Sequence, residues 1–280
     1  VATQDTTLTS ELGLTGLAAT NKRHRSESVT LNTRYYFNET VDANLQLYAT
    51  ANRYLDAEAT GLSDYNYGSA VLNANYQYSD QSAFFLQSTV GHLQVPIQQK
   101  SFGFIGGSEY SKTNLSAVLG YNWLLSPLWE VTVSAGPSQV RTKTAVASGQ
   151  EYSLKLTRKS ELMTLDTAFN RDVTPSGYGL LSRRDRVQFV LSQPVSERWL
   201  TRWLLTSVRT RNIGNDGALD FGLLDYRDFT GYIGWRYSPT WTISLSAGYA
   251  RQQTQGSDSA AGRRHAALNI SWNGLPHRLY

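Results

Sequence analysis

Large apolar and small polar residues alternate along this chain, most clearly from Trp241 to Tyr249. The odd positions of this stretch are aromatic, aliphatic or alanine, whereas the even positions are threonine, serine or glycine. Because successive side chains of a β-strand point to opposite faces, this period of two predicts a strand with one apolar face. A uniformly small and polar second face is typical of a strand that lies between lipid and the interior of a barrel.

The same alternation recurs on both sides of this strand. Residues 229–237 alternate in the same way and are followed at once by the turn Ser238 to Thr240, whereas residues 266–272 follow a longer polar loop. The sequence therefore predicts a repeating unit of strand, short turn, strand and longer polar loop.

This repeating unit can be followed through the whole chain and predicts about 14 strands, within a range of roughly 12 to 16. Pro137 has no N–H for the ladder, so we expect the seventh strand to end or bulge there. A basic loop, Lys22 to Arg25, is expected between the first two strands. The predicted strands are 6–17, 28–37, 43–50, 70–78, 84–93, 115–123, 129–135, 152–157, 163–170, 184–193, 199–209, 229–237, 241–249 and 266–272.

The predicted fold is all-β: a closed antiparallel transmembrane β-barrel over residues 1–273, followed by a C-terminal tail at 274–280. In lipid every backbone N–H and C=O must be paired inside the protein, so the first strand is expected to close against the last, with Leu8 to Leu14 beside Leu268 to Trp272. Short turns are expected on the periplasmic side of the bacterial outer membrane.

Composition agrees with an exported barrel and excludes several other classes. No apolar run approaches the roughly 18 to 20 residues that a membrane-spanning helix needs, and the absence of cysteine excludes a disulfide scaffold. The formal net charge is +4, but the basic residues are scattered over loops and strand ends, so nucleic acid is not an expected partner. No basic and then apolar leader precedes the first strand, and we expect any export signal to have been removed or left out.

Aromatic and basic residues gather at opposite ends of the predicted strands. The aromatic residues are expected to form a belt at one membrane interface, although the core of a soluble sandwich is an alternative explanation. The basic residues are expected either to contact lipopolysaccharide phosphates or to be solvated loop charges. The belt is Tyr35, Phe37, Tyr76, Tyr78, Tyr121, Trp123, Trp129, Trp199, Tyr237, Trp241 and Trp272, and the basic set is Arg23, Arg25, Arg141, Lys143, Arg183, Arg184, Arg209, Arg211, Arg251, Arg263 and Arg264.

The short turns and the strands beside them resemble those of a known group of proteins. The turns read SPTW, SPLW and SERW, and a strand such as TISLSAGYARQ alternates hydroxyl and apolar residues. This arrangement, clearest from Arg158 to Trp272, resembles the bacterial outer-membrane β-barrel porin families associated with exopolysaccharide secretion loci. The resemblance implies an outer-membrane barrel with a part in polymer export and identifies no ligand-binding residue. Trp272 fits the aromatic end of such barrels, whereas the segment from Gly274 to Tyr280 departs from it.

Candidate chemistry is confined to side chains that parity directs into the barrel. The four histidines are scattered without metal-ligand spacing, and no serine stands out as a nucleophile, so neither a metal, a cofactor nor an enzyme activity is expected. The predicted lumen lining comprises Glu11, Arg34, Asn44, Gln46, Tyr48, Asn75, Lys155, Asp166, Arg186, Arg202, Asp228, Tyr232 and Arg236.

Two functions are compatible with such a lining. One is a porin-like channel that exports a polysaccharide or passes a polar or anionic solute, because amide, phenol and arginine groups can exchange hydrogen bonds with a sliding polymer. The alternative is a structural barrel whose lumen is filled and which anchors a secretion assembly or partner protein. Barrels of intermediate strand number do not decide between these functions.

Overall fold

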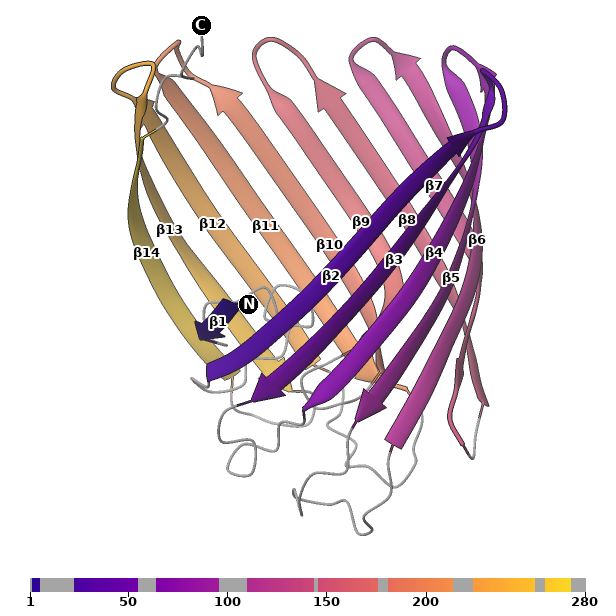
Figure 1. The fold of residues 1–280 in the computed structure, drawn as a ribbon. Helices are drawn as coiled ribbons and strands as arrows, with labels where there is room; N and C mark the ends of the chain where they lie inside the picture. The colour runs from indigo at the N-terminus through magenta and orange to yellow at the C-terminus, as the bar shows by residue number, and fades with distance from the viewer. Residues whose placement is uncertain are drawn as a thin grey trace, which may run out of the picture.

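In a computed structural model the chain forms one antiparallel sheet whose strands are neighbours in the order in which they occur in the sequence (Figure 1). The structure describes residues 2–5, 23–54, 64–95, 110–143, 146–175, 181–213, 224–254 and 260–272. The strands are β1 Ala2–Asp5, β2 Arg23–Tyr36, β3 Val41–Tyr54, β4 Tyr65–Ser79, β5 Ser82–Val95, β6 Tyr110–Ser126, β7 Trp129–Arg141, β8 Val146–Lys159, β9 Thr164–Pro175, β10 Leu181–Pro194, β11 Trp199–Asn212, β12 Leu224–Arg236, β13 Trp241–Thr254 and β14 Ala260–Trp272.

No helix among these residues is long and apolar enough to cross a membrane.

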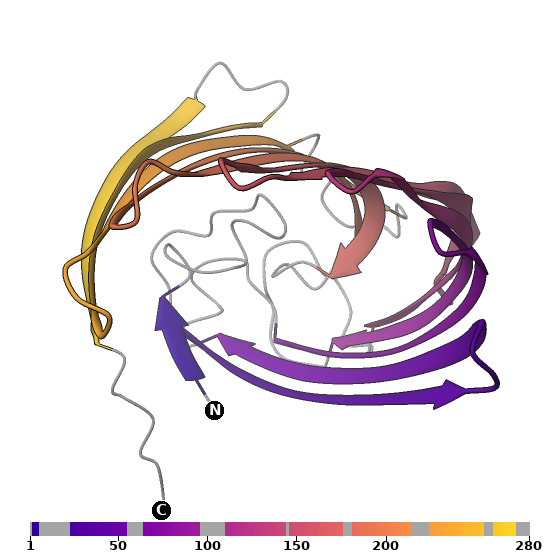
Figure 2. The same cartoon turned by 90° about the horizontal axis from the view of Figure 1, so that it is seen from above.

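The predicted all-β barrel architecture is confirmed. Each predicted strand from the second to the last overlaps one of β2 to β14 in order, and the wall curves round an interior (Figure 2). The strands are longer than predicted at the end opposite the short turns. The loop expected at Lys22 to Arg25 is wrong because β2 already begins at Arg23. Polar strand ends lack the apolar alternation from which the strands were predicted.

The predicted closure of the barrel is not formed by the described strands. Among them, β14 pairs with β13 alone, and the sheet runs from β1 to β14 without returning to its start. The first observed strand, β1, pairs with Arg23 to Ser26 of β2. The first predicted strand, from Thr6 to Leu17, lies outside the described residues, as does the tail at 274–280, so both remain predictions.

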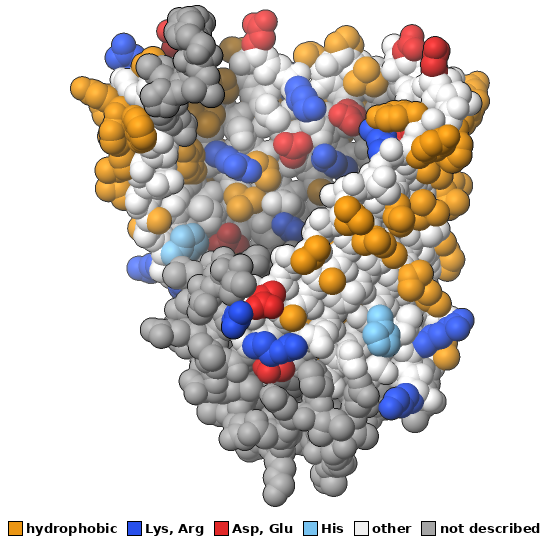
Figure 3. Space-filling view, viewed as in Figure 1, with side chains coloured by type: hydrophobic (Ala, Val, Ile, Leu, Met, Phe, Trp, Pro, Cys, Tyr) orange, Lys and Arg blue, Asp and Glu red, His pale blue; other side chains and the backbone are white. Residues whose placement is uncertain are grey.

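The outer face of the wall is apolar, as the alternation predicts. Ile233, Leu245 and Leu268 are direct cross-strand partners on β12, β13 and β14, and they are 46%, 52% and 66% exposed. Figure 3 shows hydrophobic side chains gathered on the flanks of the wall and charged ones in the hollow between them. A band of exposed leucine, isoleucine and phenylalanine side chains is stable only in contact with hydrocarbon, so the wall spans a membrane.

The aromatic residues beside the short turns lie on neighbouring strands and contact one another. Trp199 stacks on Trp235 with ring centroids 5.8 Å apart, and the rings of Trp241 and Trp272 are 6.4 Å apart. Most of the predicted belt is exposed on the outer face. Amphipathic rings at this position are typical of a membrane interface.

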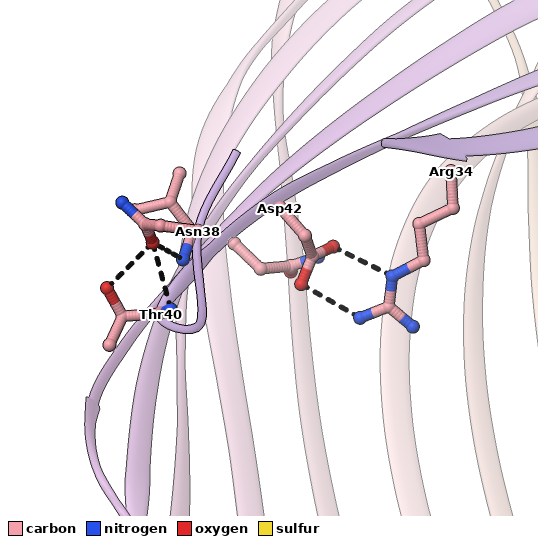
Figure 4. A network of polar contacts seen from close by, with 6 residues as sticks. Arg34, Asn38, Thr40 and Asp42 are labelled. Carbon is pink, nitrogen blue, oxygen red and sulfur yellow. Dashed lines mark hydrogen bonds and ion pairs between the residues drawn. The ribbon is translucent and has the colours of Figure 1, made fainter. Parts of the chain in front are cut away.

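The short turns share a side-chain oxygen that accepts backbone N–H groups. In the β2–β3 turn, Asn38 Oδ1 accepts from the backbone N of Thr40 at 2.9 Å and of Val41 at 2.7 Å (Figure 4). Ser238 Oγ does the same for the backbone N of Thr240 and of Trp241. Such local bonds stabilise a tight turn, which explains the serine at the start of each SPTW-type motif.

Pro137 does not end β7, so that prediction is wrong. The strand continues to Arg141, and Pro137 is opposite Gln150 of β8. On the other side, pairing with β6 is interrupted between Leu119↔Ala135 and Ser116↔Ser138, with the same register before and after the gap. The missing N–H of proline is therefore accommodated by opening one ladder locally, without a bulge in the strand.

The face assignment predicts unequal effects of one substitution at adjacent positions. Leu245→Arg puts a charge on the lipid face and is expected to cost roughly 2 to 4 kcal/mol if it lies near the bilayer midplane. Ser246→Arg on the opposite face is expected to cost much less, because that side chain faces the interior. Urea unfolding in lipid vesicles measures both free energies, and equal losses would show that the faces are wrongly assigned.

Candidate functional site

The candidate site is the inner wall at the short-turn end. Every predicted lumen residue except Glu11, which lies outside the described residues, is on a strand at a position whose alternation directs its side chain inward. The register brings some of them together as direct partners, such as Arg34 with Asn44 and Arg202 with Tyr232. These side chains therefore share the inner face of the sheet, although they come from strands all along the chain.

At one side of the mouth Arg34 is held by a carboxylate. Its Nε and Nη2 donate to Asp42 Oδ1 and Oδ2 at 3.0 and 2.8 Å (Figure 4), and Asn75 Nδ2 donates to Asp42 Oδ1 at 2.9 Å. The Arg34 guanidinium also lies over the Tyr36 ring, 4.8 Å from its centroid. The sequence reading missed Asp42 because it assigned the preceding residues to a turn. Its parity with Asn44 could have shown that it faces inward.

Further along the inner wall, polar side chains line adjacent strands. Asn44, Gln46 and Tyr48 take alternate positions of β3 and are half-buried, and the Tyr48 ring is 6.5 Å from that of Tyr67. Asp166 accepts a hydrogen bond from Thr157 Oγ1 at 2.8 Å. These residues form the amide and hydroxyl part of the lining.

The inner wall of β10 combines paired and incompletely paired cations. Arg184 donates from Nε and Nη2 to Asp172, at 3.0 and 2.6 Å. Arg186 Nη2 donates to Gln188 Oε1 at 3.1 Å, whereas its buried Nε has no acceptor. Arg184 is thus part of an ion pair that joins β9 to β10, and Arg186 retains an unneutralised charge beside it.

Three further lumen cations are exposed. Lys155, Arg202 and Arg236 point into the wide part of the lumen, and none of them forms an ion pair with another described residue. Arg236 and Tyr232 also line a hollow of about 190 Å³ beside the β10–β11 turn. Asp228, by contrast, accepts a hydrogen bond from Thr230 Oγ1 at 3.2 Å. The short-turn mouth therefore presents three cations without an ion-pair partner among the described residues, with the exposed carboxylate of Glu130 on β7 near Lys155.

The opposite end of the lumen is narrowed by the wall itself. Pairing of β8 with β9 ends at Tyr152↔Arg171, whereas β9 and β10 stay paired as far as Pro175↔Leu181. The end of β9, salmon in Figure 2, accordingly turns into the interior. There Leu181 and Ile213 form a buried cluster with inner-face residues of β4, β5 and β7. The cluster comprises Tyr65, Leu93, Val140, Leu181 and Ile213, with Tyr67, Val95, Ala147 and Val173 packed against it.

A buried lysine ties this inward-turned end to the opposite wall. Lys112 of β6 is 1% exposed, and its Nζ donates to the backbone oxygen of Ile213 at 2.8 Å. The sequence analysis missed these contacts because Leu181 and Ile213 lie at strand ends, where alternation no longer shows which face is buried. These contacts narrow the lumen at the end opposite the short turns.

Within the described part of the chain, no group of three or more histidine, aspartate and glutamate side chains could hold a metal ion.

The chain was compared with known proteins at the level of sequence and structure. A scan against protein-family models finds no match. A search of curated proteins also finds none. The structure is similar to an iron transporter, FrpB from Neisseria meningitidis (F3-3 variant), with a TM-score of 0.57 and 10% identity over 83% of this chain and 44% of that one. It is also similar to the copper transporter OprC, with a TM-score of 0.55 and 9% identity over 91% of this chain and 52% of that one.

These similarities show the fold. The chain has the outer-membrane β-barrel fold. It spans about half the length of the solved structures that it matches. Together with the exposed apolar band, the fold places this protein in the bacterial outer membrane. The similarity identifies no substrate, because identity is far too low to transfer one.

The buried cluster predicts energetic coupling between distant strands. Leu93→Ala and Leu181→Ala are each expected to cost about 2 to 5 kcal/mol, and a double-mutant cycle is expected to give a coupling energy of at least about 0.5 kcal/mol. Urea unfolding in micelles measures all the variants. Val208, which belongs to a separate buried cluster, supplies the control, since Leu93→Ala and Val208→Ala should be additive. Additivity of the first pair would contradict the packing of the inward-turned end.

Proposed function

We propose that the protein is an outer-membrane channel that binds and passes polar, negatively charged solutes through its short-turn mouth. The observation that carries this proposal is the set of exposed lumen cations Lys155, Arg202 and Arg236, which lack carboxylate partners among the described residues. Unpaired charges on a water-filled wall select ions of the opposite sign. Solved structures with the same fold include proteins named as iron and copper transporters, which supports the transport class.

The lumen is wider at the short-turn end than at the opposite end, and this direction favours export of a polymer. Short turns of bacterial barrels face the periplasm, so the wide cationic mouth lies on the side from which an exported chain arrives. Inner-wall groups such as Asn44, Gln46 and Tyr232 can exchange hydrogen bonds with sugar hydroxyls, each bond being weak enough to permit sliding. An acidic polysaccharide is therefore the solute class that this lining suits best, in agreement with the resemblance of the short turns to those of polymer-export porins.

A second candidate function is supported by the inward-turned end of β9 to β11. Leu181, Ile213 and Lys112 cross the lumen opposite the mouth with apolar contacts and one charge-assisted hydrogen bond. A barrel filled in this way would serve as an anchor in the membrane for a secretion assembly or partner protein. Planar-bilayer recordings of the full chain separate the two functions. Stable conductance steps support the channel, whereas silence at all voltages supports the anchor.

Neutralising the mouth should change ion selectivity. The triple variant Lys155→Gln, Arg202→Gln, Arg236→Gln is expected to fold normally, because these side chains have no ion pair to lose, and to reduce the anion preference of the open channel. Reversal potentials in a salt gradient measure that preference, which should weaken in the unmodified protein as salt increases. Arg25→Gln, at an exposed outer position, is the control. Unchanged selectivity of the triple variant would contradict the proposed role of the mouth.

A further inference from the structure

Three exposed arginines lie together on the outer face of β12, β13 and β14, near the ends of the strands opposite the short turns. Arg227 and Arg251 are direct cross-strand partners. Arg251 is opposite Gly262, which places Arg264, two residues further along β14, on the adjacent diagonal. Partners of this kind have Cβ atoms about 4.5 to 5.5 Å apart, and diagonal neighbours are separated by about 7 to 8 Å. The three guanidinium groups can therefore reach one common ligand.

Inward-facing residues on the same strands show which way this arginine triad, Arg227, Arg251 and Arg264, points. Thr230 Oγ1 is hydrogen-bonded to His265 Nε2 at 3.2 Å on the other face of the same strands, and Ala250 is buried there. The triad itself is exposed. Because strand side chains alternate, the arginines must project away from the lumen.

The triad is not neutralised by the protein. Directly opposed like charges destabilise a sheet, yet no described carboxylate forms an ion pair with Arg227, Arg251 or Arg264. The next row of the same outer face is different: Arg171, Asp185, Arg209 and Asp225 follow one another across β9 to β12, with Arg171 bonded to Asp185 and Arg209 to Asp225. The outer arginines of that row are therefore paired with aspartates, whereas the triad has no ion-pair partner among the described residues.

The triad surrounds the position on β14 where Gly262 has no side chain. A Cβ atom on Gly262 would lie 2.8 Å from the Tyr249 hydroxyl, so this phenol lies in the space beside Arg251 where a side chain of β14 would otherwise stand. An O–H group, which can donate a hydrogen bond, thus joins the three guanidinium groups around one opening. All four groups are donors suited to the oxygens of a phosphate.

The triad also lies at a defined depth relative to the membrane. Phe229, Tyr249 and Arg264 form one outer row. Toward the short turns the next outer row is Gly231, Ala247 and Ala266, and the row after that holds the exposed apolar residues Ile233, Leu245 and Leu268. The arginines therefore begin where the apolar band ends, on the side away from the short turns. With short turns in the periplasm, this is the headgroup level of the outer leaflet.

We propose that Arg227, Arg251, Arg264 and Tyr249 form a binding site for a phosphate group of lipopolysaccharide. The phosphate accepts charge-assisted hydrogen bonds from the arginines and offsets the repulsion between Arg227 and Arg251, while the acyl chains lie against the apolar band below. This site is separate from the lumen and does not depend on the transport function proposed above.

Binding of lipid A to the refolded full chain in detergent micelles, measured by native mass spectrometry, tests the proposal. Arg227→Gln, Arg251→Gln, Arg264→Gln is expected to bind lipid A at least about tenfold more weakly than the unmodified protein, since several charge-assisted bonds are lost. Tyr249→Phe should give a smaller loss. Lipid A stripped of its phosphates should bind the unmodified protein as weakly as lipid A binds the triple variant.

The lumen variant Lys155→Gln, Arg202→Gln, Arg236→Gln removes the same charge from the interior and is the matched control, which should bind lipid A normally. Heat-dependent mobility on gels checks folding. Should the triple variant fail to fold, Arg251→Gln alone, which relieves the like-charge pair, replaces it with a smaller expected loss. Equal binding by the outer-face variant and the unmodified protein would overturn the proposal. So would equal binding of dephosphorylated lipid A, or binding of phosphatidylglycerol as tight as that of lipid A.

Discussion

The structure depends on one constraint: in hydrocarbon, backbone N–H and C=O groups must find their partners within the protein. Here each strand from β3 to β13 meets this constraint by pairing on both sides with its neighbours in the sequence, whereas β14 is paired on one side only among the described strands. Side chains are then sorted by alternation alone, with apolar residues facing lipid and small or polar residues facing the interior. The same constraint applies to the short turns, whose backbone N–H groups also need acceptors. The side-chain oxygens of Asn38 and Ser238 accept hydrogen bonds from these N–H groups.

The parts of the fold that could be predicted are those set by local alternation. Leu245 and Trp241 were assigned to the apolar, lipid-facing side from their immediate neighbours, and both are exposed. The inward turn of β9 to β11 could not be predicted in this way, because Lys112 and Ile213 meet across 101 residues of sequence. Their strand ends contain polar residues whose periodicity resembles that of a loop. In the candidate site, strand alternation correctly predicted that Arg202 and Arg236 face inward. Their lack of a carboxylate partner among the described residues could not be predicted, because it depends on neighbours in three dimensions.

Arginine has two different roles in this wall, and the presence or absence of a carboxylate partner distinguishes them. Where strands approach their ends, Arg171 and Arg209 bond to carboxylates on adjacent strands, and Arg184 does so on the inner face. Such pairs join β9 to β12 around the point where the wall turns inward. Arg202 and Arg236, which form no ion pair with a described carboxylate, face the wide lumen, and the triad Arg227, Arg251 and Arg264 lies at the proposed headgroup level. In both places an external anion can take the place of the missing acid.

The strand ladder of the wall and the inward-turned end of the lumen are stabilised by different interactions. Each ladder strand is fixed by a row of backbone hydrogen bonds that lipid makes costly to break. The inward-turned end is held instead by a small apolar cluster and the Lys112 bond to Ile213. Regions with few such contacts open locally at a lower free energy than the whole protein unfolds. The inward-turned end is therefore expected to open at a lower free energy than the hydrogen-bonded ladder of the wall.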